Sequence, residues 1–174
     1  MCVVMVCGFL CAGPGDFRSQ ARAADEAGDW RAGVAVAVIT PAKSMMLAGF
    51  GSRTKPSEGT ATELHAKALA LQDSRGTRLV IVTTDLIGIP RPLRDRVEAR
   101  VKERFKLPSA SLLMNASHTH CGPELKMTKT ALEELSEERQ KLTVEYCRRL
   151  ENALVKLVGD VLADCTPARL SYSH

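Results

Sequence analysis

The chain is poor in aromatic residues, which make up only 4% of its 174 residues. Proteins that bind single-stranded nucleic acids stack the bases on aromatic side chains, and sugar sites use similar platforms, so this scarcity disfavours both ligand classes. The net charge is a modest +4, and basic residues are interleaved with acidic ones instead of forming a basic stripe. We therefore expect no nucleic-acid partner.

The chain begins with an apolar run, Cys2 to Ala12, that is too short for a membrane span of about 20 residues. Its length is typical of a signal-peptide core, and Ala21-Arg22-Ala23 fits a cleavage site before Ala24. Residues 1–23 are therefore predicted to be a signal peptide, which implies a secreted or periplasmic protein. An uncleaved or disordered leader is the alternative, because no positive charge precedes the run and the gap between the run and the cleavage site is long.

Cysteine pairs with metal-binding spacing are also missing. Of the six cysteines, three lie in the leader, and the others are Cys121, Cys147 and Cys165. An odd number without a CxxC pair indicates neither a disulfide framework nor a zinc ribbon. Cys147 falls within a helical pattern and is expected to be buried.

The chain is 45% apolar and 25% charged, which is typical of one globular domain with a core. Its periodicity predicts an α/β fold, in which a mixed β-sheet is flanked by helices. Strands are expected at residues 33–39, 64–71, 79–84, 112–116 and 168–172, and helices at 93–105 and 133–163.

Turn signals predict how these strands pair. Asp73-Ser74-Arg75-Gly76 predicts a hairpin and therefore an antiparallel pair. The strand–helix–strand unit that follows predicts a right-handed crossover between parallel strands.

The first strand does not alternate apolar with polar residues, so it is expected to be buried on both faces. The long helix is interpreted as a surface helix packed on the sheet, in preference to a coiled coil. The chain is expected to be truncated, because it stops at the first residues of a strand.

Two of the four histidines, His118 and His120, lie one residue apart directly after a predicted strand. Side chains at i and i+2 of an extended segment point to the same side, so both imidazoles can converge on one point. Neutral imidazole suits zinc, which makes the pair a candidate metal or catalytic site. Asp85, at the end of the neighbouring strand, is expected either to orient an imidazole or to cap a helix. The alternative is that both histidines are structural.

Six segments of the chain share their order and spacing with one known family: Gly33–Pro41, Leu47–Gly51, Leu64–Leu69, Asp85–Pro90, Pro167–Leu170 and, most specifically, Asn115–Pro123. Together they resemble the amino-terminal domain of the neutral/alkaline, non-lysosomal ceramidases. The resemblance covers residues 31–174 and implies a partial α/β/β/α-type sandwich, an incomplete part of a catalytic domain.

The resemblance implies a zinc-dependent amidase that cleaves the N-acyl bond of ceramide to give sphingosine and a fatty acid. It assigns His118 as a zinc ligand and His120 as a catalytic residue that does not bind the metal. The other ligands and the catalytic serine of the family come later in its chains, so these 174 residues alone are expected to be inactive. The substrate also implies contact with a membrane surface. A zinc hydrolase of another N-acyl or ester substrate and a non-catalytic fragment are the alternatives.

The residues around the histidines carry weaker expectations. Cys121 stands where the family commonly has serine, and is interpreted as an isosteric replacement in preference to a third zinc ligand. The loop Gly49-Phe50-Gly51 is a candidate lining of the site. His65 is expected to lie on the sheet surface or in the core, and nothing supports a role for His174.

Overall fold

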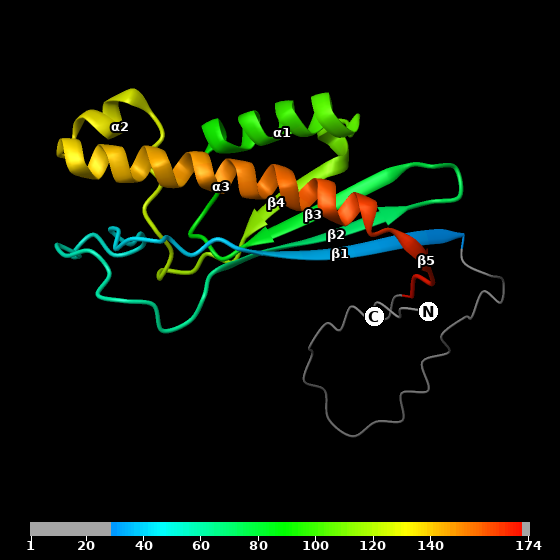
Figure 1. Cartoon of the computed structure of the whole chain (residues 1–174), viewed down its shortest axis with the longest axis horizontal. Coiled ribbons are helices and arrows are strands. Elements are labelled where there is room, and N and C mark those ends of the chain that lie inside the picture. Colours follow the sequence, from blue (N-terminus) through cyan, green and yellow to red (C-terminus); the bar gives the residue numbers. More distant parts are fainter. Residues whose placement is uncertain (1–28, 172–174) are drawn as a thin grey trace, which may run out of the picture.

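A computed structural model describes residues 29–171 as a mixed five-stranded sheet with helices packed on one face (Figure 1). The strands are β1 (Trp30–Val38), β2 (His65–Gln72), β3 (Arg78–Thr84), β4 (Leu112–Ala116) and β5 (Thr166–Ala168), in the order β4-β3-β2-β1-β5. The helices are α1 (Arg91–Phe105), α2 (Lys129–Glu133) and α3 (Glu137–Ala163), with a 3₁₀ turn at Ser109–Ser111. The predicted α/β class is confirmed.

The predicted leader, residues 1–23, lies outside the described residues. Between residues 29 and 171, no helix has both the length and the apolar character that a membrane crossing requires.

The strand pairing follows the turn signals of the sequence. The hairpin between β2 and β3 is closed by Asp73, whose backbone N–H donates to the Thr77 carbonyl at 3.0 Å and whose carboxylate accepts from the Thr77 N–H at 2.7 Å. β2 and β3 are antiparallel, whereas β3 and β4 are parallel and are joined through α1. The carboxyl ends of β3 and β4 therefore meet at the same edge of the sheet.

The core lies between the sheet and the two long helices. The residues of β2 that face α3 are small, so the helix can lie close to the sheet. Gly33 of β1 has no side chain, so α3 can also approach the backbone of β1 closely at this position. A Cβ atom on Gly33 would lie 2.4 Å from the Val161 carbonyl oxygen of α3. The fully buried side chains include Ala66, Val80, Val82, Leu93, Val97, Val101, Leu154 and Val158.

Leu154→Ala tests this packing. The side chain is fully buried at the centre of α3, so its truncation leaves a cavity and is expected to lower the free energy of unfolding by about 2–5 kcal/mol. Val144→Ala is the matched control on the same helix, because Val144 is 52% exposed. Chemical denaturation measures both variants, and equal losses would show that α3 does not pack on the sheet as described.

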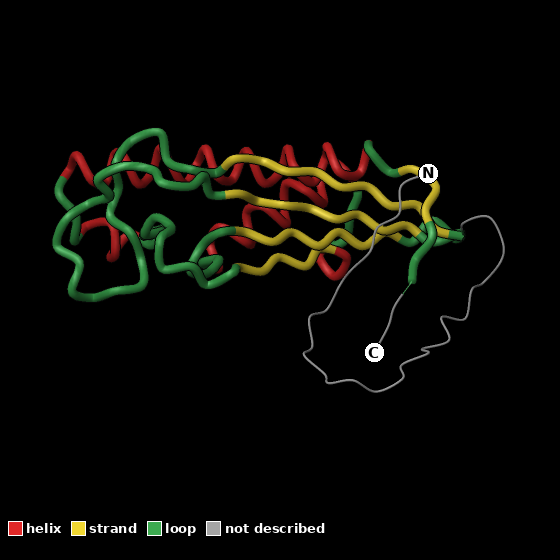
Figure 2. Tube along the Cα trace, turned by 90° about the horizontal axis from the view of Figure 1, so that it is seen from below, coloured by secondary structure: helices red, strands yellow, loops and turns green. Residues whose placement is uncertain are grey.

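The prediction that β1 is buried on both faces is wrong. Val34, Val36 and Val38 are 53%, 62% and 51% exposed. Alternate residues of a strand point to opposite faces, and α1 and α3 cover only one face of this sheet (Figure 2). The register places Val34, Leu69, Ile81 and Leu113 in one row across the open face.

Two predicted element boundaries are also corrected. The helix expected from residue 133 begins at Glu137, after a separate short helix α2 whose N-cap, Thr128, accepts a hydrogen bond from the Ala131 N–H at 3.3 Å. The last strand begins at Thr166 instead of Ala168, because residues Thr166–Ala168 pair with the start of β1. α3 packs on β1 and β2, which confirms the surface helix over the coiled coil.

Candidate active site

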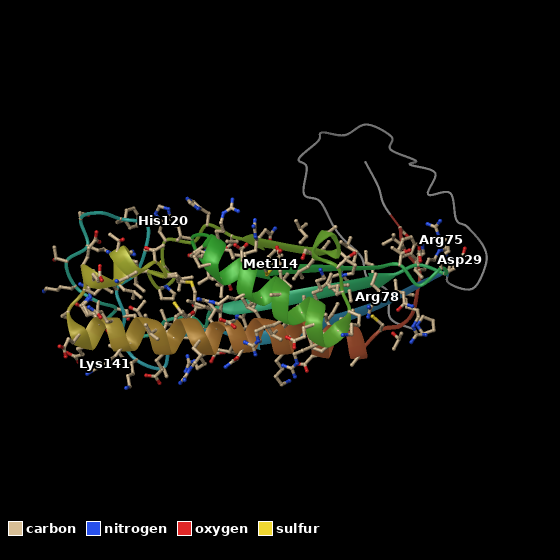
Figure 3. The ribbon with its side chains drawn as sticks, turned by 90° about the horizontal axis from the view of Figure 1, so that it is seen from above. Asp29, Arg75, Arg78, Met114, His120 and Lys141 are labelled. Atoms are coloured by element: carbon tan, nitrogen blue, oxygen red, sulfur yellow. The ribbon has the colours of Figure 1, made fainter. Side chains whose placement is uncertain are left out.

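The His118–His120 segment lies at the edge of the sheet where β3 and β4 end. The pairing continues one residue beyond the strands, since the Ser117 N–H donates to the Thr84 carbonyl at 2.9 Å. The histidines follow immediately. Figure 3 shows His120 at the opposite end of the molecule from Arg75 of the β2–β3 hairpin. The site is therefore built from the loops that leave the carboxyl ends of two parallel strands, as in other open α/β sheets.

His118 is held by the loop that follows β3. Its Nδ1 lies 2.7 Å from the carbonyl oxygen of Ile87. A carbonyl only accepts hydrogen bonds, so Nδ1 carries the proton in the neutral imidazole and Nε2 keeps its lone pair. A backbone carbonyl on the far nitrogen is a common way to orient a metal-binding histidine. The exposed side chain of His118 therefore has the tautomer that a metal ligand needs.

His120 lies beside His118, and the two ring centroids are 5.3 Å apart with the planes at 71°. Its other neighbour is Phe50, whose ring meets the imidazole edge-on at 4.7 Å and 74°. His120 is half-buried, whereas His118 is exposed. The two imidazoles thus sit side by side in different surroundings, which suits them to different roles.

The loop Leu47–Arg53 packs against the histidine segment. Its backbone pairs with the residues after His120, since the Ala48 N–H donates to the Gly122 carbonyl at 2.9 Å and Leu47 forms an isolated bridge with Pro123. Of the loop expected to line the site, Gly49 and Phe50 lie against the His120 ring. Gly51 has open space around it, with no atom within 4 Å of the position a Cβ would take.

The rings converge for a different reason from the one expected. β4 ends at Ala116, and His118 has φ +61°, so the segment is a turn and not an extended strand. A positive φ is uncommon for a residue other than glycine, and it is often found where a site imposes it. The two loops, and not strand alternation, bring the histidines together.

Asp85 has neither of the expected roles. Its Oδ2 accepts from the His65 N–H at 2.9 Å, and its own N–H donates to the His65 carbonyl at 2.9 Å. Helix α1 has Pro90 at its N-cap without a side-chain hydrogen bond. Asp85 therefore closes the end of the β2–β3 pair. The His65 imidazole lies on the sheet surface, 3.8 Å from the Glu63 carboxylate.

The described residues contain no group of three or more His, Cys, Asp or Glu side chains that could hold a metal ion. Within residues 29–171, Cys121 therefore forms no three-residue group with His118 and His120, and its interpretation as an isosteric replacement stays a prediction. A catalytic zinc site takes several protein ligands and keeps one position open. His118 fits as one such ligand through Nε2, and the described part of the chain supplies no complete set.

A cleft of about 700 Å³ lies beside the histidine segment. It is lined by the loops 40–44 and 57–64 and by Leu47, Asp85, Thr119 and Cys121, and neither His118 nor His120 is among its lining residues. Thr119 and Cys121 alternate with the histidines in sequence, so one short segment contributes both to the cleft wall and to the imidazole pair.

The three cysteines of the described region differ in accessibility, which gives a test of the structure. Cys121 is exposed, whereas Cys147 and Cys165 are buried. Burial raises the pKa of the Cys147 thiol to about 11 and also raises the pKa of Cys165. The thiolate is the reactive form of cysteine. A raised pKa therefore lowers the fraction of the thiol that is present as thiolate at any pH below about 11.

At about pH 8, iodoacetamide is expected to modify Cys121 in the folded protein, and Cys147 and Cys165 only after unfolding. Peptide mass mapping measures each site. The Cys121→Ser variant should lose the fast-reacting site of this region. Modification of Cys147 in the folded protein as fast as that of Cys121 would contradict the burial described here.

Comparison with known proteins shows the family of the chain. Residues 30–172 match the family model described as neutral/alkaline non-lysosomal ceramidase, N-terminal. The match covers most of the chain, and the chain therefore belongs to this family.

Solved structures give the same fold. The chain is similar to the neutral ceramidase from Pseudomonas aeruginosa, with 25% identity and a TM-score of 0.60 over 82% of this chain and 23% of that one. It is also similar to a ceramidase complexed with C2, with 25% identity and a TM-score of 0.62 over 80% of this chain and 22% of that one. The chain thus spans less than a quarter of these relatives. Among curated protein sequences, none matches it significantly.

Proposed function

We propose that the chain contributes His118 and His120 to a zinc-dependent site that hydrolyses the N-acyl bond of ceramide, releasing sphingosine and a fatty acid. Family membership supports the substrate class. The single observation that carries the chemistry is the hydrogen bond between His118 Nδ1 and the Ile87 carbonyl, at 2.7 Å, because it leaves Nε2 free beside a second imidazole.

Amide hydrolysis needs an activated nucleophile and stabilisation of the developing oxyanion. A bound zinc ion supplies both, by lowering the pKa of its water to about 7 and by polarising the carbonyl. In this proposal His118 gives its Nε2 lone pair to the metal. His120 remains unligated, and can donate a hydrogen bond to the carbonyl oxygen or a proton to the leaving amine.

The substrate would come from a lipid phase, so we also propose that the protein works at a membrane surface. The cleft is lined by Thr119 and Cys121 of the segment that carries the two histidines, so it lies beside that segment. Export, proposed from the leader at residues 1–23, would place this activity in a secreted or periplasmic protein.

The isolated chain of 174 residues is expected to hold zinc weakly and to leave ceramide intact. The reason is the ligand count, since His118 is one ligand and the described residues form no complete group. Metal analysis after dialysis should find far less than one equivalent of zinc. A full equivalent, or ceramide turnover that a chelator abolishes, would contradict this.

The proposed reaction is tested with the product of the complete open reading frame and a fluorescent ceramide. We expect release of the fatty acid, loss of release with a chelator, and recovery when zinc is added back. N-acyl amino acids and esters of the same acyl chain serve as competing substrates. Preferential hydrolysis of one of these would favour another zinc hydrolase, and the absence of turnover on all of them would contradict an enzymatic role.

A further inference from the structure

We propose that Gly49, Phe50 and Arg53 form a clamp that fixes the imidazole of His120, and that Arg53 is a positioning residue for the proposed reaction. The catalytic meaning of the clamp rests on the proposed function, whereas its geometry stands independently.

Arg53 ties together two segments that lie 67 residues apart in sequence. Its Nη1 donates to the carbonyl oxygen of His120 at 2.6 Å and to that of Ala48 at 2.8 Å. Hydrogen bonds from a charged donor are stronger than those between neutral groups. The backbone of His120 is therefore held by the loop that carries Gly49 and Phe50.

The same guanidinium also supports the His120 ring, through its contact with Phe50. It lies over the face of Phe50, with 4.9 Å between Cζ and the ring centroid. Phe50 in turn meets the His120 ring edge-on at 4.7 Å. The result is a stack from Arg53 through Phe50 to His120, in which a cation–π contact and an aromatic contact share one ring.

The backbone of Gly49 lies directly against the His120 imidazole. A Cβ atom at this position would lie 2.4 Å from Cγ of His120, and the residue has φ +102°. Only glycine combines this conformation with this close approach. Together, Gly49 and Phe50 contact the His120 ring and Arg53 holds its backbone, with the ring lying beside His118.

A fixed ring matters for the proposed chemistry because a displacement of about 1 Å from the productive geometry can cost about 100-fold in rate. His120 would have to meet the carbonyl oxygen or the leaving nitrogen of a substrate held by other groups. The clamp would set that position before the substrate arrives.

The test uses two clamp variants, Gly49→Ala and Arg53→Met, in the product of the complete open reading frame. Each has a matched control. Gly51→Ala changes a glycine of the same loop that has open space around it, and Arg75→Met removes an exposed guanidinium from the distant hairpin. The readouts are the NMR signals of the His120 ring in protein with isotope-labelled histidine, the thermal midpoint, and kcat and KM on ceramide.

We expect the His120 ring signals to shift in both clamp variants and in neither control. With ceramide, kcat should fall about 10- to 100-fold in the clamp variants while KM stays within about twofold, because binding is kept and orientation is lost. If the Gly49→Ala variant fails to fold, the test uses the Arg53→Met variant alone.

The proposal is overturned if the ring signals of His120 stay in place in a folded clamp variant, or if they move equally in a control. A lower thermal midpoint with unchanged ring signals and unchanged kcat would mean that these residues only stabilise the fold, which also overturns it. If the unmodified protein does not hydrolyse ceramide, the proposed function fails, and the ring signals alone decide the clamp.

Discussion

Replacing His118 with alanine is expected to remove zinc and ceramide hydrolysis together. Losing the hydrogen-bond partner of a metal ligand already costs about 10- to 100-fold in metal affinity, so losing the ligand itself should cost more than about 100-fold. Without the metal, the proposed reaction would have neither its nucleophile nor its Lewis acid. Metal analysis and fatty-acid release on the same preparation, made from the complete open reading frame, measure both effects.

His65→Ala is the matched control for this variant. His65 is also a histidine close to the end of the sheet, but its imidazole lies on the sheet surface beside Glu63. Its backbone pairing with Asp85 does not need the side chain. We expect unchanged zinc content and activity. A His118→Ala protein that keeps stoichiometric zinc would show that the metal is held without this residue.

His120→Ala is expected to keep the zinc and lose the rate. Its imidazole lies beside His118 but has a different environment, between Phe50 and the loop backbone. General acid–base groups contribute about 10²- to 10⁴-fold, so kcat should fall by that factor while metal content stays constant.

The comparison of the two variants separates the roles of the histidines. Zinc lost from His118→Ala and retained in His120→Ala supports one ligand and one catalytic imidazole. Equal zinc loss in both would mean that both bind the metal, and the proposed division between them would be wrong.

Local signals in the sequence predicted much of the fold. Asp73-Ser74-Arg75-Gly76 predicted the hairpin, because the Asp73 carboxylate can accept from the turn N–H groups, as it does here. Apolar residues at Leu93, Val97, Val101 and Phe105 are spaced by four, which indicates one apolar face of α1; the first three are fully buried and Phe105 is partly buried. In these elements local and tertiary preferences agree.

The exposure of β1 could not be predicted in the same way. The strand alternates valine with glycine or alanine, so both of its faces are apolar. The residues that decide which face is covered belong to α3, more than a hundred positions later in the chain. Small residues face the helix and the valines remain exposed, because α3 approaches closely enough to exclude a larger side chain at Gly33.

The proximity of His118 and His120 was predicted, but the geometry that produces it was not, and the roles of the two residues stay predictions. The spacing of His118 and His120 identified the pair, but the expected extended segment is a turn with a positive φ. Arg53 was not identified at all, because it lies in a polar loop whose sequence has no motif. Its contact with the His120 carbonyl spans 67 positions, and a single sequence carries no signal for a contact of that range.

The central claim is that His118 presents Nε2 to zinc while His120 stays free. It is tested most directly by an anomalous difference map, recorded at the zinc edge from crystals of the protein made from the complete open reading frame. We predict a peak about 2.0–2.1 Å from His118 Nε2, with Nδ1 still bonded to the Ile87 carbonyl. A peak on His120 instead, or no peak at His118 in crystals that contain zinc, would contradict the account.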